Sequence, residues 1–244
     1  PQYLLLKVSR KEMFLTALSL VILLSFGIFF ATSHKTFNEA EKPHHQQYKE
    51  LARSLKEGKV YLDYEPSEEL LTAENPYDTI YLQANGIDYR ADYALFEGRY
   101  YVYFGIVPEV LLYLHCYLLT GHDLPNYIAV FIFYAGFVFG VFGLYYELIR
   151  AYFPKVNLWS YLIVSIFTSV CAPFAYVYST ADLYSVPIMA GLCFLSLGLW
   201  FILKGKRVTG KFRTISYLLG ALCTALVAGC RPQMILFGLV VIHI

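Results

Sequence analysis

The sequence predicts an all-α membrane protein: a bundle of transmembrane helices, with a large extracytoplasmic loop after the first helix that contains juxtamembrane helices. Hydrophobic residues make up 58% of the 244 residues and charged residues 15%, whereas soluble domains average about 25% charged residues. Apolar runs of membrane-spanning length also recur along the chain. They cover residues 14–31, 127–149, 158–178, 185–203 and 214–229, and a further run starts at 234.

These runs divide the chain into three parts. Residues 1–32 are predicted to form a cytoplasmic tail and the first transmembrane helix, which we expect to stay uncleaved. Residues 33–126 are predicted to form the extracytoplasmic loop, and residues 127–244 about five transmembrane helices, the last of them truncated. Because the chain starts at Pro1 and stops inside an apolar run, we interpret it as the N-terminal piece of a longer protein.

The orientation depends on residues 104–119. Basic short loops belong in the cytoplasm. If residues 104–119 crossed the membrane, the basic loop at 204–213 would lie on the side of the large polar loop, away from the basic N-terminus. The segment offers only about 14 helical residues and carries Glu109, and both properties disfavour a span. We therefore predict an interfacial helix here, with the N-terminus and every basic loop in the cytoplasm.

The polar loop carries local signals for several elements. Apolar residues recur at helical spacing between Gln46 and Gly58, which predicts an amphipathic helix that ends at this glycine. The tyrosine-rich residues 100–104 are read as a short strand or an extended segment. Pro108 is placed to start a helix that Gly121 ends.

One motif precedes the juxtamembrane helix: Gly98-Arg99-Tyr100-Tyr101-Val102-Tyr103-Phe104-Gly105-Ile106-Val107-Pro108. It is the most specific of several stretches that together resemble the GT-C superfamily of membrane glycosyltransferases, nearest its protein O-mannosyltransferase and aminoarabinose-transferase branch. Ser179-Thr180-Ala181-Asp182 and Gly229-Cys230-Arg231-Pro232 match more loosely, each between apolar runs. The order of anchor, polar loop and further spans also agrees with this family.

The resemblance implies an activity. Such enzymes move a sugar from a polyprenyl-phosphate donor to a glycan, lipid or protein acceptor outside the cytoplasm, and we expect this one in a bacterial cell membrane. No nucleotide site is needed and no glycine-rich phosphate loop occurs, while the need for a divalent metal stays open. The net charge of +1 gives no reason to expect a nucleic-acid partner.

The reaction needs a carboxylate or another base for the acceptor hydroxyl. Asp182 is the first candidate, with a cap of the following helix as its structural alternative. The family's Asp-Glu motif before the helix tyrosine would fall on His44 and His45, so these histidines and Asp92 are alternative bases. A solvated loop pair is the ordinary interpretation of the histidines, and a turn or surface position that of Asp92.

The leaving phosphate and the sugar need cationic, polar and aromatic groups. The predicted substrate-binding residues are Arg231, Arg99, Tyr103, Glu109 and Tyr48. Their structural alternatives are snorkelling of Arg231, an ion pair of Arg99 with Glu97, packing by the tyrosines, and an interaction of Glu109 with the helix start. The family's Lys-Pro pair has no lysine here, since Ile106-Val107 precedes Pro108.

Two other functional classes stay open at this point. The missing lysine and the His44-His45 pair fit a non-catalytic scaffold or a binder of lipid-linked glycans. A polytopic transporter or flippase is the other class, but charges inside the apolar runs, which such a protein would use, are few.

Overall fold

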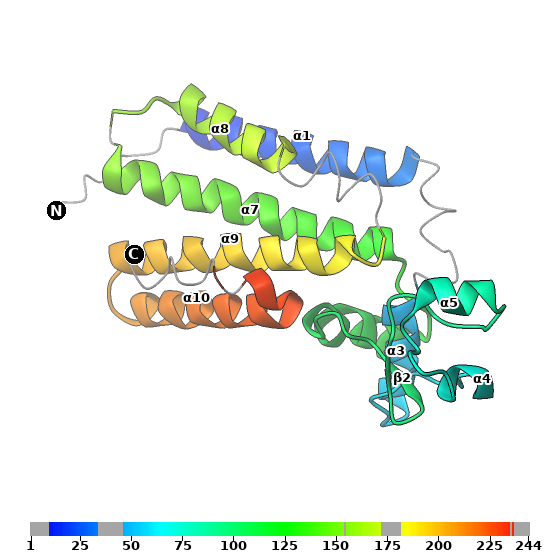
Figure 1. Ribbon diagram of the computed structural model, residues 1–244. Coiled ribbons are helices and arrows are strands. Elements are labelled where there is room, and N and C mark those ends of the chain that lie inside the picture. Colours follow the sequence, from blue (N-terminus) through cyan, green and yellow to red (C-terminus); the bar gives the residue numbers. More distant parts are fainter. Residues whose placement is uncertain (1–9, 34–45, 154, 172–181, 235, 237–244) are drawn as a thin grey trace. The chain divides into compact units, whose positions relative to one another are not determined.

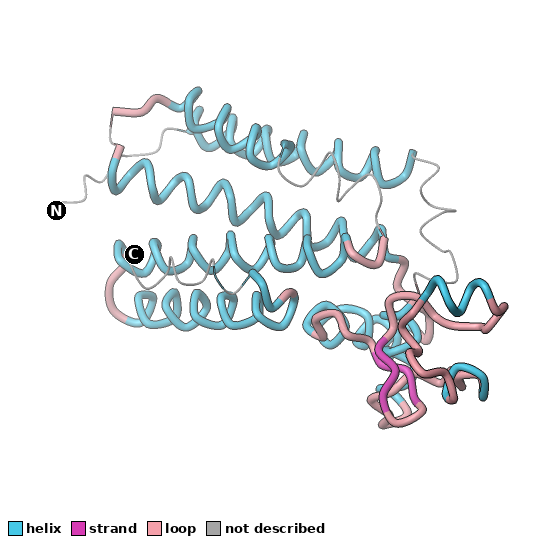
Figure 2. The backbone as a smooth tube through the Cα atoms, in the orientation of Figure 1, coloured by secondary structure: helices cyan, strands magenta, loops and turns pink. Residues whose placement is uncertain are grey.

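The computed structural model describes residues 10–33, 46–153, 155–171, 182–234 and 236, and these fall into two compact units. Unit 1 takes its described residues from Pro1–Ala40 and Asn126–Ile244, and unit 2 takes its from Glu41–Pro125. Helices account for 71% of the structure. A two-stranded hairpin in unit 2, drawn in magenta in Figure 2, is the addition to the predicted all-α class.

Unit 1 is a bundle of apolar helices. It comprises α1 (Arg10–Ser33), α7 (Asn126–Tyr152), α8 (Leu158–Cys171), α9 (Ser185–Arg207), α10 (Lys211–Cys230) and the short η4 (Pro232–Met234). Four of these, α1, α7, α9 and α10, are long and apolar enough to cross a membrane, which is the architecture of an integral membrane protein. The described helix of the predicted span 158–178 ends at Cys171, and the run from 234 lies almost entirely outside the described residues.

Glycines let α7 and α9 approach closely. A Cβ atom added to Gly136 would lie 2.5 Å from Cys193 Sγ, one on Gly140 would lie 2.8 Å from the Leu197 backbone nitrogen, and one on Gly143 would collide with the Trp200 ring. Small residues at this spacing allow two helix backbones to approach closely.

The same contacts fix the directions of the helices. Successive positions of α7 meet successive positions of α9 in the same order, so these two helices run parallel. On the other side of α9, Gly191 lies near Cys230 and Gly205 near Tyr217, so α10 runs antiparallel to α9. Gly27 of α1 contacts Tyr134 near the start of α7, so α1 begins at the end where α7 finishes, as Figure 1 shows.

The basic residues of these helices therefore gather at one end of unit 1, which we call the basic end. It holds the start of α1, the end of α7, the start of α8, the end of α9 and the start of α10. Its described cations are Arg10, Lys11, Arg150, Lys155, Lys204, Lys206, Arg207, Lys211 and Arg213. This is the grouping that the predicted topology requires, because a cytoplasmic surface collects lysine and arginine.

Unit 2 is built from short elements. It contains α3 (Gln47–Lys56), α4 (Glu68–Leu71), α5 (Thr79–Ala84), strands β1 (Ala94–Phe96) and β2 (Arg99–Tyr101), the π-helix η2 (Glu109–Tyr113) and α6 (Leu114–Thr120). Its hydrophobic core is centred on Leu51 of α3, Leu70, Leu82, Tyr93 and Tyr100.

The predicted boundaries in unit 2 agree with the structure where local chemistry sets them. The amphipathic helix ends just before Gly58, which has φ +77°, and α6 ends at Gly121 with φ +72°. Only glycine adopts this left-handed backbone without strain. The segment Glu109–Thr120 is shorter than a membrane-spanning helix, as expected, and its location along a membrane surface stays a prediction.

Candidate functional site

Tyr48 is a core residue of unit 2. Its side chain is 1% exposed, its ring stacks on Tyr113 at 5.3 Å between centroids, and its hydroxyl donates a 3.2 Å hydrogen bond to the Gly105 carbonyl. These contacts join α3 to η2 and to the chain that leads into it. The structure therefore gives Tyr48 the packing role that was the alternative to substrate binding.

Glu109 lies beside this stack, at the first position of the π-helix. Its side chain is fully buried, and neither carboxyl oxygen has a hydrogen-bond partner among the described residues. Burial raises the pKa of Glu109 to about 9, because the charged form loses its hydration without gaining a partner. Glu109 is thus a neutral acid at pH 7, and it does not cap the helix start. Isolated π-helical turns are frequent at functional sites.

Asp92 stands where three segments of unit 2 meet. Its backbone has φ +63°, a left-handed conformation that Asp tolerates better than most residues. The Gln47 side chain donates a 2.6 Å hydrogen bond to the Asp92 carbonyl, and the Tyr103 hydroxyl lies 3.5 Å from Asp92 Oδ1. The structure thus brings together Asp92 and Tyr103, two of the predicted site residues, and leaves the Asp92 side chain exposed.

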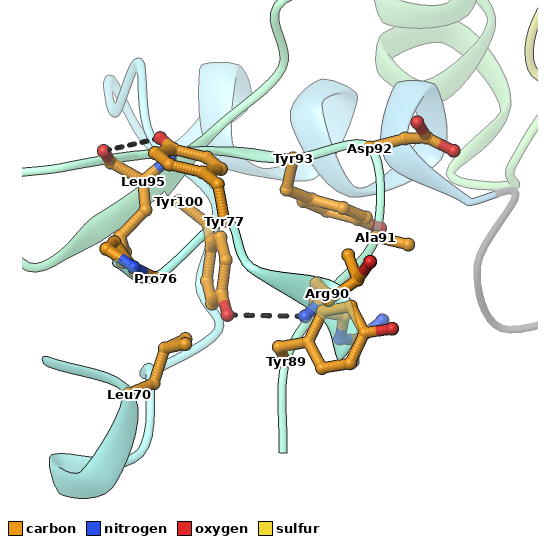
Figure 3. A pocket seen from close by; sticks show the side chains of 11 residues that line it. Leu70, Pro76, Tyr77, Tyr89, Arg90, Ala91, Asp92, Tyr93, Leu95 and Tyr100 are labelled. Atoms are coloured by element: carbon orange, nitrogen blue, oxygen red, sulfur yellow. Dashed lines mark hydrogen bonds between the residues drawn. The ribbon is translucent and has the colours of Figure 1, made fainter. Parts of the chain in front are cut away.

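A small cavity of about 60 Å³ lies behind Asp92, lined by tyrosines and by Arg90. Figure 3 shows Asp92 at the edge of this cluster, with its carboxylate pointing away from Tyr77 and Tyr89. Backbone strain of the kind seen at Asp92 tends to persist at functional positions. An exposed carboxylate held by its backbone can approach a hydroxyl group that comes from solution.

Arg90 is a feature that the sequence analysis missed. Its guanidinium group lies 3.9 Å from the centre of the Tyr64 ring and 3.7 Å from Glu50, which also accepts a 2.9 Å hydrogen bond from the Tyr93 hydroxyl. Burial and the Glu50 carboxylate raise the pKa of Tyr93. No spacing in the sequence signals this cluster, because Glu50 is on α3 and its partners are about forty residues further along the chain.

Arg99 occupies a different surface of unit 2. The hairpin pairs Phe96 with Arg99 across Glu97 and Gly98, which have φ +48° and +71°. Positive φ at both central residues is typical of the tight turns that match the twist of a hairpin. The Arg99 guanidinium lies 4.1 Å from the centre of the Tyr61 ring. No ion pair joins it to Glu97, which was the structural alternative; this holds for the described residues.

An open groove of about 640 Å³ runs beside Arg99, lined also by Tyr61, Tyr64, Asp63 and Glu65. Aromatic rings next to a cation and carboxylates can contact both faces and hydroxyl groups of a sugar. The structure therefore separates the predicted unit 2 residues into two places, with Arg99 at the groove and Asp92, Tyr103, Tyr48 and Glu109 around the start of α3 and of η2.

Asp182 and Arg231 both belong to unit 1, and they lie at the same end of the antiparallel pair α9 and α10. This is the end opposite the basic end, since α9 starts there and α10 finishes there. Asp182 Oδ1 accepts 2.8 Å hydrogen bonds from both the backbone N–H and the hydroxyl of Ser185. The carboxylate therefore satisfies the first N–H of α9, so the predicted capping alternative is present in the structure.

Arg231 follows the last residue of α10 in an extended conformation, and its backbone carbonyl accepts a 3.0 Å hydrogen bond from Met234 N–H. Its Nε atom is buried, and no described residue accepts a hydrogen bond from it. A buried guanidinium donor without an acceptor favours an anionic ligand, because leaving the donor unsatisfied costs free energy.

The remaining candidates for the general base, His44 and His45, lie outside the described residues. Across the described ranges, no three His, Cys, Asp or Glu side chains gather closely enough to hold a metal ion. A scan against protein-family models, a search of curated proteins and a search of solved structures each found no match to the chain.

Proposed function

We propose that the chain is an integral membrane glycosyltransferase of the GT-C type, which moves a sugar from a polyprenyl-phosphate donor to an acceptor outside the cytoplasm. The observation that carries this proposal is that Asp182 and Arg231 lie at the same end of unit 1, opposite the basic end. If the basic end faces the cytoplasm, this carboxylate and this cation face the outer leaflet together.

The chemistry needs few groups. A carboxylate takes the proton of the acceptor hydroxyl while the oxygen forms a bond to the anomeric carbon of the sugar. The bond between that carbon and the phosphate oxygen breaks, and the polyprenyl phosphate leaves with the electron pair and a negative charge. Arg231, whose Nε donor has no acceptor among the described residues, is the group that we assign to this phosphate.

Asp92 and Asp182 are the two described candidates for the base. Asp92 is exposed and held in a left-handed conformation, whereas one oxygen of Asp182 already accepts two hydrogen bonds from Ser185. We assign binding of the acceptor to Arg99 and the groove beside it, because tyrosine rings and carboxylates line that surface. Tyr103 is a positioning residue for Asp92.

The test is transfer of labelled sugar by the purified chain in liposomes. The probes are polyprenyl-phosphate mannose and polyprenyl-phosphate aminoarabinose, offered with a cell-envelope extract as the source of acceptors. We expect transfer from at least one of the two donors, and loss of transfer in Arg231→Gln. Donor that stays intact under every condition contradicts a transferase.

Two aspartate variants identify the base. Asp92→Asn and Asp182→Asn each remove a carboxylate while keeping the backbone preference or the capping oxygen. Glu97→Gln is the matched control, since Glu97 is also exposed at positive φ and loses the same charge. Loss of transfer in one aspartate variant, with normal transfer in Glu97→Gln, assigns the base. Normal transfer in both aspartate variants removes both residues from the mechanism.

A non-catalytic binder of lipid-linked glycans is the second candidate. The hydrogen bonds from Ser185 to Asp182 favour it, because they give this carboxylate a structural role. Such a protein binds the polyprenyl-phosphate sugar in an Arg231-dependent manner but never consumes it, so the same liposome assay separates the two candidates.

A further inference from the structure

A groove of about 470 Å³ opens at the surface of unit 1, on the side of α1. Residues of α1, α7 and α9 line it, together with Tyr161 of α8. Its walls are mainly apolar: Met13, Ala17 and Leu20 come from α1, and Phe139 and Phe142 from α7. The volume lies within the range of sites for small organic ligands. Ala17 is exposed, so the groove is accessible along α1.

The charged residues that line this groove lie at the basic end. Lys204 and Arg207 of α9 and Glu147 of α7 line it there. Arg207 donates two 2.7 Å hydrogen bonds to the Glu147 carboxylate, so this pair carries no net charge. Lys204 has no carboxylate partner among the described residues, and its Nζ lies 5.4 Å from the centre of the Trp200 ring. The groove thus presents one uncompensated positive charge.

The surroundings add to that charge. Arg150 and Lys206 lie close to Glu147 and Arg207 around a neighbouring small cavity. Among the described residues, Glu147 is the one carboxylate that lines either cavity, against four cations. Trp200 and Tyr146, which also line the groove, are side chains that prefer the membrane–water interface. The groove therefore combines an apolar trough with a positive opening at the basic end.

We propose that this groove binds an anionic glycerophospholipid of the leaflet at the basic end, with an acyl chain along α1 and the phosphate beside Lys204. An acyl chain matches the apolar walls, and a phosphate matches a lysine that lacks a partner. Basic pockets between transmembrane helices on the cytoplasmic side are suited to anionic headgroups. A soluble anion would match Lys204 but not the apolar walls, and a lipid without net charge would leave the charge of Lys204 uncompensated.

This inference does not depend on glycosyl transfer. It requires that unit 1 is in a membrane, and it concerns the end of the helices opposite Asp182 and Arg231. A negative result in the transfer assay therefore leaves it intact, and failure of the lipid assay leaves the proposed function intact.

Trp200 provides a direct reporter. The sequence contains two tryptophans, and the other, Trp159, is exposed on α8 and can be replaced by Phe. The full chain carrying Trp159→Phe is reconstituted in nanodiscs of phosphatidylcholine with increasing fractions of phosphatidylglycerol brominated on one acyl chain. Bromine quenches the Trp200 fluorescence when the brominated acyl chain occupies the groove. Brominated phosphatidylcholine in a phosphatidylcholine bilayer is the neutral comparison.

We expect half-maximal quenching at a lower mole fraction of the brominated phosphatidylglycerol than of the brominated phosphatidylcholine. Lys204→Gln should raise the fraction of phosphatidylglycerol needed by about fivefold, which corresponds to about 1 kcal/mol for one lysine at an anionic surface. Lys211→Gln is the matched control, because Lys211 is at the basic end but does not line the groove. It should leave the titration unchanged.

A second pair of variants tests the trough. Ala17→Phe fills the groove from α1 and should reduce quenching by both lipids, whereas Leu18→Phe adds bulk to an exposed position that does not line it. Circular dichroism checks that each variant is folded. Equal half-quenching fractions for the two lipids, or equal titrations of Lys204→Gln and Lys211→Gln, would overturn the proposal. Unchanged quenching in a folded Ala17→Phe variant would also overturn it, because bromine would then reach Trp200 from the surrounding bilayer and not from the groove.

Discussion

Glu147 on α7 and Arg207 on α9 form a bidentate ion pair with two hydrogen bonds of 2.7 Å. Glu147 is 4% exposed, so the carboxylate is held away from water and depends on Arg207 for its stabilisation. Since α7 and α9 run parallel, the pair fixes the register of the two helices at the basic end, next to the close packing at Gly143.

Removing one partner of this pair should destabilise unit 1. Glu147→Gln leaves Arg207 without its carboxylate, and we expect a loss of about 3 kcal/mol, typical of breaking a buried pair. Thermal unfolding in detergent micelles measures the change. Asp63→Asn is the control, because it breaks the exposed pair with Lys59, and exposed ion pairs contribute little to stability. Equal unfolding temperatures for the two variants would show that the pair contributes little.

Gly140 should not accept a larger side chain. A Cβ atom there would lie 2.8 Å from the backbone nitrogen of Leu197, which cannot move without shifting α9. Gly140→Ala should therefore destabilise the protein by about 1–3 kcal/mol through overpacking. Ile132→Phe adds more volume at an exposed position of α7 and should have little effect on thermal unfolding. A Gly140→Ala protein as stable as Ile132→Phe would contradict the close approach of the two backbones.

Glu109 should make the stability depend on pH. Burial raises the pKa of Glu109 to about 9 in the folded protein from an ordinary 4.5, so the folded state holds a proton that the unfolded state releases. The stability that protonated Glu109 contributes is therefore fully present below pH 4.5 and is lost as the pH rises towards 9. The loss at pH 7 is on the order of 3 kcal/mol.

Glu109→Gln removes this ionisation and should be more stable than the original protein at neutral pH. The difference between the two unfolding curves, measured from pH 5 to pH 9, isolates this residue from other titrating groups. Because the wild-type protein alone loses stability across this range, the curves should diverge with rising pH. Parallel curves would mean that Glu109 is ionised in the folded protein.

Asp182→Asn should leave the stability of the protein unchanged, whereas Asp182→Ala should lower it. Asn keeps an oxygen that can accept the hydrogen bonds from Ser185, whereas Ala removes it and should cost about 1 kcal/mol. Thermal unfolding of the two variants distinguishes the cases. If Asp182→Ala unfolds at the same temperature as Asp182→Asn, the carboxylate does not stabilise the start of α9.

Local sequence signals predicted the helices well. Apolar runs predicted α1, α7, α9 and α10, and the glycines at 58 and 121 correctly marked two helix ends. Such features depend on a few neighbouring residues, so a single sequence contains them. The π-helix at Glu109 was not predicted, because its hydrogen bonds shift by one residue without any change in the apolar pattern.

The interactions between distant residues were not predictable in the same way. Glu147 and Arg207 are 60 residues apart, and the sequence analysis gave no pairing for either. Tyr48 was predicted to bind substrate, with packing as the alternative, and its stacking partner Tyr113 follows from the fold. The candidate bases were named from a resemblance, and the structure adds that Asp182 contacts Ser185 while Asp92 has a left-handed backbone.

The central claim is that the proposed site is extracytoplasmic. The most direct test determines on which side of the membrane unit 2 and the loop between α9 and α10 lie. Single cysteines replace Glu74 in unit 2 and Thr209 between α9 and α10, both exposed, in a background without the native thiols. A membrane-impermeant thiol reagent is then applied to intact cells and to permeabilised cells. We predict that position 74 reacts in intact cells and that position 209 reacts only after permeabilisation. Reaction of both positions from the same side, or the reverse pattern, would contradict an extracytoplasmic site.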